Sequence, residues 1–290
     1  MKKMTFPATI AAFCLLAASA HAQIVINIVN PDEALKSEPI DEVLFTAQYE
    51  MTSVADTAQR DRTEKEMMML KAGARSSVFY SYAKYLTDSV IEADKASGAS
   101  VDVIVEHINK YRSRINYKIY KNYPNGKTTT LEHLAINRFR CEENNDVPRW
   151  ELFPDTATLL GYTCRKAVCR FKGRDYEAWF TEDIPRSEGP WKLQGLPGLI
   201  LKAQDARREY VFECVALIQG KPGDSIAFGA SGHEPISRKD LNRLFERYAA
   251  DPAGYIASAA PNVKVQIRNK EGEAISPKNT PYNPIELSEQ

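Results

Sequence analysis

Residues 191–200 read Trp-Lys-Leu-Gln-Gly-Leu-Pro-Gly-Leu-Ile and combine stiff turn residues with large apolar side chains. Pro197 fixes φ near the value that the second position of a turn needs, and Gly198 follows where a type II turn requires a positive φ. This pattern predicts a tight turn, after which the apolar residues 199–201 open a buried strand. Trp191 and the leucines before Pro197 are unusual in a solvated loop, so we expect the loop to lie over apolar surface.

The connection over residues 184–198 carries prolines and glycines but no helix or strand pattern. A segment of this length is typical of a lid, a binding loop or a packed plug. In one interpretation its apolar side chains line a cavity for an apolar ligand or a groove for a peptide. In the other, which we favour, they close the end of a sheet. The candidate binding residues are Trp179, Trp191, Leu193 and Leu196, and the residues expected to shape the turn are Gly195, Pro197, Gly198, Leu199 and Ile200.

A wider spaced pattern surrounds this turn over roughly residues 150–217. Its parts are Gly161-Tyr162-Thr163-Cys164-Arg165-Lys166-Ala167, Gly173-Arg174, Ala178-Trp179-Phe180-Thr181, Ile184-Pro185, Gly189-Pro190 and Gly195-Leu196-Pro197-Gly198-Leu199-Ile200. The pattern resembles the GLPGLI family of exported bacterial proteins. Phe180 stands where that family more often has a tyrosine, so no role for a phenolic hydroxyl is carried over. The resemblance implies an envelope protein with a β-rich fold, and it implies no established reaction.

The first 22 residues have the pattern of a signal peptide. Lys2 and Lys3 are followed by an apolar run over residues 10–18 and by Ala20-His21-Ala22, a small-x-small cleavage site. The apolar run is too short for an ordinary transmembrane helix. We therefore expect an exported protein that is periplasmic, outer-membrane associated or secreted, and that is not an integral membrane protein.

Composition indicates one globular domain with no strong excess of either charge. Of 290 residues, 43% are hydrophobic and 26% charged, which suits a chain that buries a sizeable core. Basic and acidic residues number 38 each, so removal of Lys2 and Lys3 leaves 36 against 38, a net charge near −2. Neither nucleic acid nor an anionic membrane is expected as a partner. We expect one β-rich domain over residues 23–268 and, because prolines recur among polar residues, a loose tail over residues 269–290.

Local patterns predict an α+β fold. Period-two alternation marks a strand over residues 43–53, and turn residues separate several further strand pairs between residues 66 and 217. Helical spacing appears near residues 82–110, as two helices, and near residues 238–249, where Ser237 and Asp240 resemble a capping box. The expected architecture is a bent antiparallel sheet of eight or more strands, or a partly open barrel, with these helices on or beside it.

The cysteines are expected to be structural. After residues 1–22 four remain, which permits two disulfides with three connectivities in an oxidising compartment, and we favour bridges over free thiols. The disulfide candidates are Cys141, Cys164, Cys169 and Cys214. Cys164 and Cys169 are five positions apart and point to opposite faces of a straight strand, which disfavours a bond between them. Closely spaced ligand pairs for zinc are absent, and no metal or cofactor is expected.

Catalytic signatures are also missing from the sequence. It contains no nucleophile elbow, no zinc-protease helix and no phosphate-binding glycine loop. A nucleophile formed by Cys164 and His133 is conceivable, but a bridged thiol cannot attack. The sequence therefore favours a non-catalytic binding or accessory protein of the envelope that uses loop 184–198 to hold a hydrophobic ligand or an envelope protein partner. The alternatives are an envelope hydrolase with an unrecognised active site and a scaffold for an outer-membrane machine.

Arg174, a charged residue of this pattern, is expected to pair with an acidic side chain. A Gly-Arg turn needs only small or polar residues, so an arginine at position 174 suggests a bidentate ion pair. Asp183 and Glu182 are the nearest acidic candidates along the chain. Arg174 is for this reason included among the candidate binding residues.

Overall fold

The structure, a computed structural model, describes residues 23–24, 37–111, 113, 115–259, 267–268, 274–275 and 278–287. The expected signal peptide over residues 1–22 lies outside the described residues, as do residues 269–273, 276–277 and 288–290 of the expected tail. No helix in the described ranges is long and apolar enough to span a bilayer.

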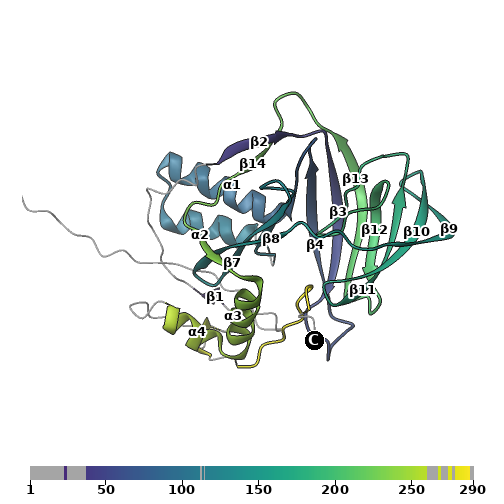
Figure 1. The fold of residues 1–290 in the computed structure, drawn as a ribbon. Coiled ribbons are helices and arrows are strands. Elements are labelled where there is room, and N and C mark those ends of the chain that lie inside the picture. The colour runs from purple at the N-terminus through teal and green to yellow at the C-terminus, as the bar shows by residue number, and fades with distance from the viewer. Residues whose placement is uncertain are drawn as a thin grey trace, which may run out of the picture.

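One bent sheet of twelve strands forms most of the fold (Figure 1). In chain order its strands are β3 (Phe45–Val54), β4 (Thr63–Ala72), β5 (Ser77–Ser81), β6 (Tyr117–Lys121), β7 (Lys127–Leu134), β8 (Asn137–Asn144), β9 (Glu151–Leu159), β10 (Tyr162–Phe171), β11 (Arg174–Thr181), β12 (Leu199–Asp205), β13 (Tyr210–Gln219) and β15 (Glu234–Ile236). Across the sheet they lie in the order β15-β8-β7-β6-β5-β4-β3-β13-β12-β11-β10-β9, and only β15 and β8 pair in parallel. Within the described strands, the edges β15 and β9 do not pair with each other, so the sheet stays open.

The remaining elements are smaller. β2 (Glu38–Glu42) pairs with β14 (Ser225–Phe228), and β1 (Gln23–Ile24), β16 (Ile267–Arg268) and β17 (Ala274–Ile275) form a third sheet. Helix α1 (Tyr82–Ser97) contacts β4, β5 and α2 (Val101–Lys110), whereas α3 (Arg238–Ala250) contacts β8 and α4 (Pro252–Ala259). The Ser237 side chain accepts a hydrogen bond from the Asp240 backbone N–H, which confirms the predicted cap of the C-terminal helix.

The predicted α+β class is wrong, because the described part of the protein is mostly β, with 46% of it in strands and 18% in helices. The main core lies in the bend of the sheet and contains strand and loop side chains but no residue of the four helices. Helices α3 and α4 bury a separate, smaller cluster against β8. Strands and the 184–198 loop therefore cover the core by themselves, and helices do not form a layer over it.

Loop 184–198 is packed into this core. Trp191, Leu193 and Leu196 are 2%, 0% and 1% exposed. The turn after them differs from the predicted type, because Gly198 does not have a positive φ, whereas Gly195 does, at 98°. Gly198 is needed for another reason: a Cβ placed there would lie 1.9 Å from the backbone oxygen of Thr181. Two backbones meet at this position with no room for a side chain.

The predicted disulfides are absent, because Cys141, Cys164, Cys169 and Cys214 are all free and buried. Cys164 and Cys169 are nevertheless both buried in the main core, against the expectation that they point to opposite faces of β10. Cys214 lies on β13 and Cys141 on β8, so the four thiols come from three strands of the sheet that do not neighbour one another.

These thiols are expected to be unreactive in the folded protein. Burial raises the pKa of Cys141 to about 11 and that of Cys169 and Cys214 to about 12, so the reactive thiolate is scarce at neutral pH. We expect no maleimide adduct on the native protein and adducts on all four after denaturation without a reductant, as measured by intact mass. Labelling that requires a reductant would instead reveal disulfides.

The expected loose tail is ordered over residues 278–287. The backbone N–H groups of Asn279 and Thr280 donate to the carbonyls of Ala250 and Ala249 at the end of α3. The Tyr282 ring stacks on Phe245 of α3, with centroids 6.0 Å apart. In Figure 1 this yellow segment passes from α3 towards the lower ends of β3 and β4. Polar composition misled the prediction, because these residues are fixed by hydrogen bonds to distant parts of the chain.

Candidate functional site

The apolar residues predicted to bind a ligand do not present an open surface. Trp191 packs against Phe171 and Tyr176, with ring centroids 5.9 and 6.1 Å away. Trp179 lies half-buried on β11, and its indole N–H donates to the Glu177 carboxylate at 3.2 Å. This burial favours the packed-plug interpretation of loop 184–198, and a binding role for Trp179, Trp191, Leu193 and Leu196 stays a prediction.

A buried lysine holds the loop in place. Lys121 at the end of β6 is 1% exposed, and its ammonium group donates to the carbonyl oxygen of Gly189 at 2.8 Å. The same group lies 2.5 Å from the Glu188 carboxylate. From the other side, the Trp150 indole N–H donates to the Gln194 carbonyl at 2.8 Å. Side chains thus satisfy backbone carbonyls that an irregular buried segment would otherwise leave unpaired.

Arg174 forms the predicted ion pair, but with other partners. Its Nη1 lies 3.0 Å from Asp205 and 2.8 Å from Glu209, and all three side chains are no more than 3% exposed. Glu182, one of the predicted partners, instead pairs with the exposed Arg165. Burial by itself raises the pKa of Glu209, but the hydrogen bond and charge of Arg174 outweigh it and leave that pKa below its usual value.

The other N–H groups of the Arg174 guanidinium bind residues 278–287, which we call the C-terminal segment. Nε donates to the Ile285 carbonyl at 2.9 Å, and Nη2 donates to the Asn283 side-chain oxygen at 2.8 Å and to the Pro284 carbonyl at 2.6 Å. The Tyr210 ring lies 5.0 Å from the guanidinium carbon. All five N–H donors that an arginine has are therefore used, which lysine cannot reproduce.

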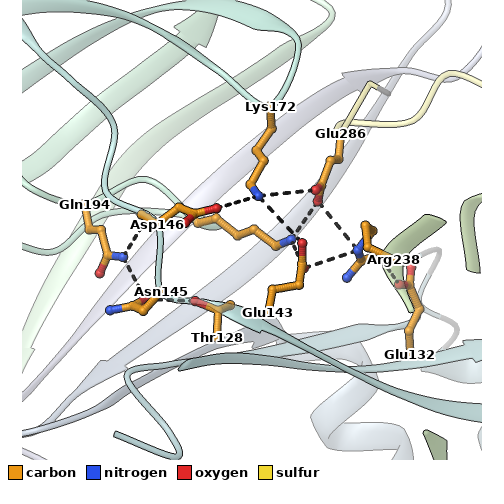
Figure 2. Close-up of polar contacts among 10 residues, drawn as sticks. Thr128, Glu132, Glu143, Asn145, Asp146, Lys172, Gln194, Arg238 and Glu286 are labelled. Carbon is orange, nitrogen blue, oxygen red and sulfur yellow. Dashed lines mark hydrogen bonds and ion pairs between the residues drawn. The ribbon is translucent and has the colours of Figure 1, made fainter. Parts of the chain in front are cut away.

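A second charge cluster connects loop 184–198, the β10–β11 turn, α3, β8 and the C-terminal segment (Figure 2). Lys192 of the loop lies 2.7 Å from Glu143 of β8 and 2.6 Å from Glu286. Arg238, the first residue of α3, lies 3.3 Å from Glu143. Lys172, in the turn between β10 and β11, lies 3.6 Å from Glu143 and 3.8 Å from Glu286. Five segments of the chain are joined here by partly buried charges.

Glu143 and Glu132, two of the carboxylates that pair with Arg238, differ in pKa. Burial raises the pKa of Glu143, but Lys192 and Arg238 outweigh it and bring that pKa to about 2. Burial dominates at Glu132, and its pKa stays above the usual value although Arg238 lies 3.3 Å away. The pKa of Glu143 is the lower of the two because Lys192, as well as Arg238, contacts its carboxylate directly.

Acid is expected to weaken the protein through Glu143. Its folded-state pKa is about 2 against an ordinary 4.5, so its stabilising contribution is complete above pH 4.5 and is lost as the pH falls towards 2. The contribution is on the order of 3 kcal/mol. Urea unfolding across this pH range should show a smaller pH dependence for Glu143→Gln than for the wild type. Glu132→Gln is the matched control and should keep the acid dependence; equal slopes for wild type and Glu143→Gln would contradict the assignment.

A groove lies beside this second cluster. It has a volume of about 840 Å³ and is lined by the turn from Arg170 to Gly173. Asn242 and Glu246 of α3 also line it, as do four residues of the C-terminal segment, Tyr282, Pro284, Glu286 and Leu287. The lining mixes both charges, an amide and aromatic rings, which suits a polar chain with occasional apolar groups better than a lipid.

The structure places the residues that were considered for a metal site or a nucleophile. The described residues contain no group of three or more His, Cys, Asp or Glu side chains that could hold a metal. His133 faces His233, with ring centroids 5.6 Å apart, and burial puts the pKa of His133 well below its usual value. Cys164 lies in the main core, and burial raises its thiol pKa. The hypothetical Cys164–His133 nucleophile therefore has no support from the structure.

Sequence reasoning missed Lys121, Lys192, Glu143, Arg238 and Glu286. A signal for Lys192 was present, because a lysine between Trp191 and Leu193 in a buried loop needs a counter-charge. Its partners could not be identified, since Glu143 and Glu286 lie 49 positions before and 94 positions after it.

Comparisons with known proteins give one short family match and two distant structural matches. A family model described as a protein of unknown function (Porph_ging) matches residues 170–202, from the end of β10 to β12. No curated protein matches the chain. Two solved structures of PNGF-II resemble it with TM-scores of 0.46 and 0.45 at 14% and 15% identity, and each match covers 69% of this chain. The matches cover 32% of the PNGF-II chain, about a third of its length, and at this level they say nothing about activity.

Proposed function

We propose that the protein is an exported, non-catalytic accessory protein of the cell envelope that binds an extended segment of an envelope protein partner. The binding surface is the groove between the β10–β11 turn, α3 and residues 282–287. The observation that carries the proposal is the groove itself, at about 840 Å³, with a lining of charged, amide and aromatic groups. Export is supported by the signal-peptide pattern of residues 1–22 and by the resemblance to the GLPGLI family.

In this proposal loop 184–198 is the support of the site. Its apolar residues are buried, and its Lys192 reaches Glu286 on the groove wall at 2.6 Å. The loop thereby holds Glu286, which is one of the residues that line the groove. A hydrophobic ligand is a poorer occupant, because the main core is packed with the loop side chains that were predicted to receive it.

Site-specific photo-crosslinking in cells tests the proposal. A photoreactive residue at Asn242, on the groove wall, is expected to capture one envelope protein that the same residue at Asp102, exposed on α2, does not capture. The captured protein, once purified, should bind Arg170→Glu at least about tenfold more weakly than wild type, since Arg170 lines the groove. Identical products from Asn242 and Asp102 would overturn the proposal.

A further inference from the structure

Residues 282–287 are bound by the rest of the protein as an extended peptide is bound by a receptor. Three consecutive carbonyls accept hydrogen bonds: that of Asn283 from the Tyr210 hydroxyl, and those of Pro284 and Ile285 from Arg174. The Leu287 N–H donates to the carbonyl of Lys172 at 3.1 Å. Contacts to the main chain of a bound peptide give affinity that does not depend on the side chains of that peptide.

Two side chains of the segment add specificity. The Asn283 amide accepts from Arg174 at 2.8 Å and donates to the Val54 carbonyl, also at 2.8 Å. Glu286, three positions later, lies 2.6 Å from Lys192 and 3.8 Å from Arg238. Pro284 stands between them and restricts the backbone to an extended form. The receptor therefore reads an asparagine and, at a fixed spacing, a carboxylate.

Both donors of the receptor side also have partners outside the segment. Arg174 is held by Asp205 and Glu209 at 3.0 and 2.8 Å, and neither belongs to the segment. Lys192 is likewise held by Glu143 at 2.7 Å. If the segment left, the donors would stay in position, and pre-organised donors bind with less entropy loss.

We propose that this site is a recognition site for a partner segment with the sequence Asn-Pro-x-acidic, and that residues 283–286 are an internal copy that competes for it. The inference rests on the proposed function and names the chemistry of the partner. Tyr282, Pro284 and Glu286 line the groove, so a partner that displaced the internal copy would itself supply that side of the groove.

Fluorescence anisotropy with the full-length protein tests this inference. The probe is a labelled peptide with the sequence of residues 280–287, blocked at both ends. Bound within the same chain, the internal copy competes at an effective concentration on the order of millimolar, so wild type should bind the probe weakly. Asn283→Ala removes two hydrogen bonds of the copy and leaves the receptor intact, so the probe should bind at least about tenfold more tightly.

Two controls make the result specific. Glu286→Gln, which loosens the copy at its other anchor, should also bind the probe more tightly than wild type. A peptide with alanine for its asparagine and glutamine for its glutamate should bind both variants at least about tenfold more weakly than the probe. Circular dichroism and thermal melting confirm that each variant is folded.

The outcomes separate the inference from the function it rests on. Folded variants that bind the probe no better than wild type overturn the inference, as does a concentration-dependent dimer without probe binding, which would mean exchange of the segment between two copies. A partner captured at Asn242 together with failed probe binding leaves the proposed function standing alone. Probe binding without any capture at Asn242 overturns the proposed function and, with it, the partner named by this inference, and shows only that the segment can be displaced.

Discussion

Replacing Arg174 with alanine is expected to lower the free energy of unfolding by about 3–5 kcal/mol, the cost of breaking a buried ion pair from one side. Asp205 stays buried without a cation, and Glu209 keeps only Arg60, whose side chain is 47% exposed. The C-terminal segment also loses the donor of three hydrogen bonds. Arg174→Lys should recover only part of the loss, because one ammonium group cannot reach all of these acceptors.

Urea unfolding of Arg174→Ala and Arg170→Ala provides the comparison. Arg170 lies in the same hairpin and pairs with Asp175, but the two side chains are 71% and 62% exposed. Such a surface pair contributes no more than about 1 kcal/mol. Similar small losses for both variants would show that the Arg174 cluster does not stabilise the fold.

Gly198→Ala is expected to lower stability by more than about 3 kcal/mol, or to prevent the accumulation of soluble protein. The added methyl group would lie 1.9 Å from the Thr181 oxygen and 2.6 Å from its carbonyl carbon, and backbone atoms cannot move aside as a flexible side chain does. The displacement would separate β11 from β12, which pair at Thr181 and Leu199.

Gly161→Ala is the matched control for this substitution. Gly161 has a φ of 82°, but no heavy atom lies within 4 Å of the position that an added methyl group would take, so only backbone strain of about 1–2 kcal/mol is added. Thermal unfolding of both variants measures the difference. A larger loss for Gly161→Ala than for Gly198→Ala would contradict close backbone approach as the reason for the glycine.

Local patterns predicted the elements of the fold better than their arrangement. The alternation of residues 43–53 and the capping residues Ser237 and Asp240 depend on near neighbours, so both predictions are confirmed. The order of strands, the parallel pairing of β15 and the register shift between β9 and β10 depend on contacts across the chain. The α+β prediction failed for this reason, since sequence did not show that the helices would contribute no residue to the main core.

The candidate site was likewise predicted only in its local part. The Gly-Arg turn correctly indicated an ion pair at position 174, but Asp205 and Glu209 come from the next hairpin, 31 and 35 positions later. The carboxylate of Glu286 and the amide of Asn283 were not identified, because proline-rich polar sequence is typical of disordered tails. Their order comes from acceptors and donors fixed elsewhere in the molecule.

The hydrogen bond between Asn283 and Val54 joins residues 229 positions apart and has a consequence for biosynthesis. Val54 of β3 is synthesised long before Asn283, so this contact of β3 cannot form until residue 283 has been made. Long-range closure of this kind slows folding and prolongs the time for which aggregation-prone intermediates persist. A chain released by a ribosome that stalls before codon 283 lacks three of the hydrogen-bond acceptors of Arg174.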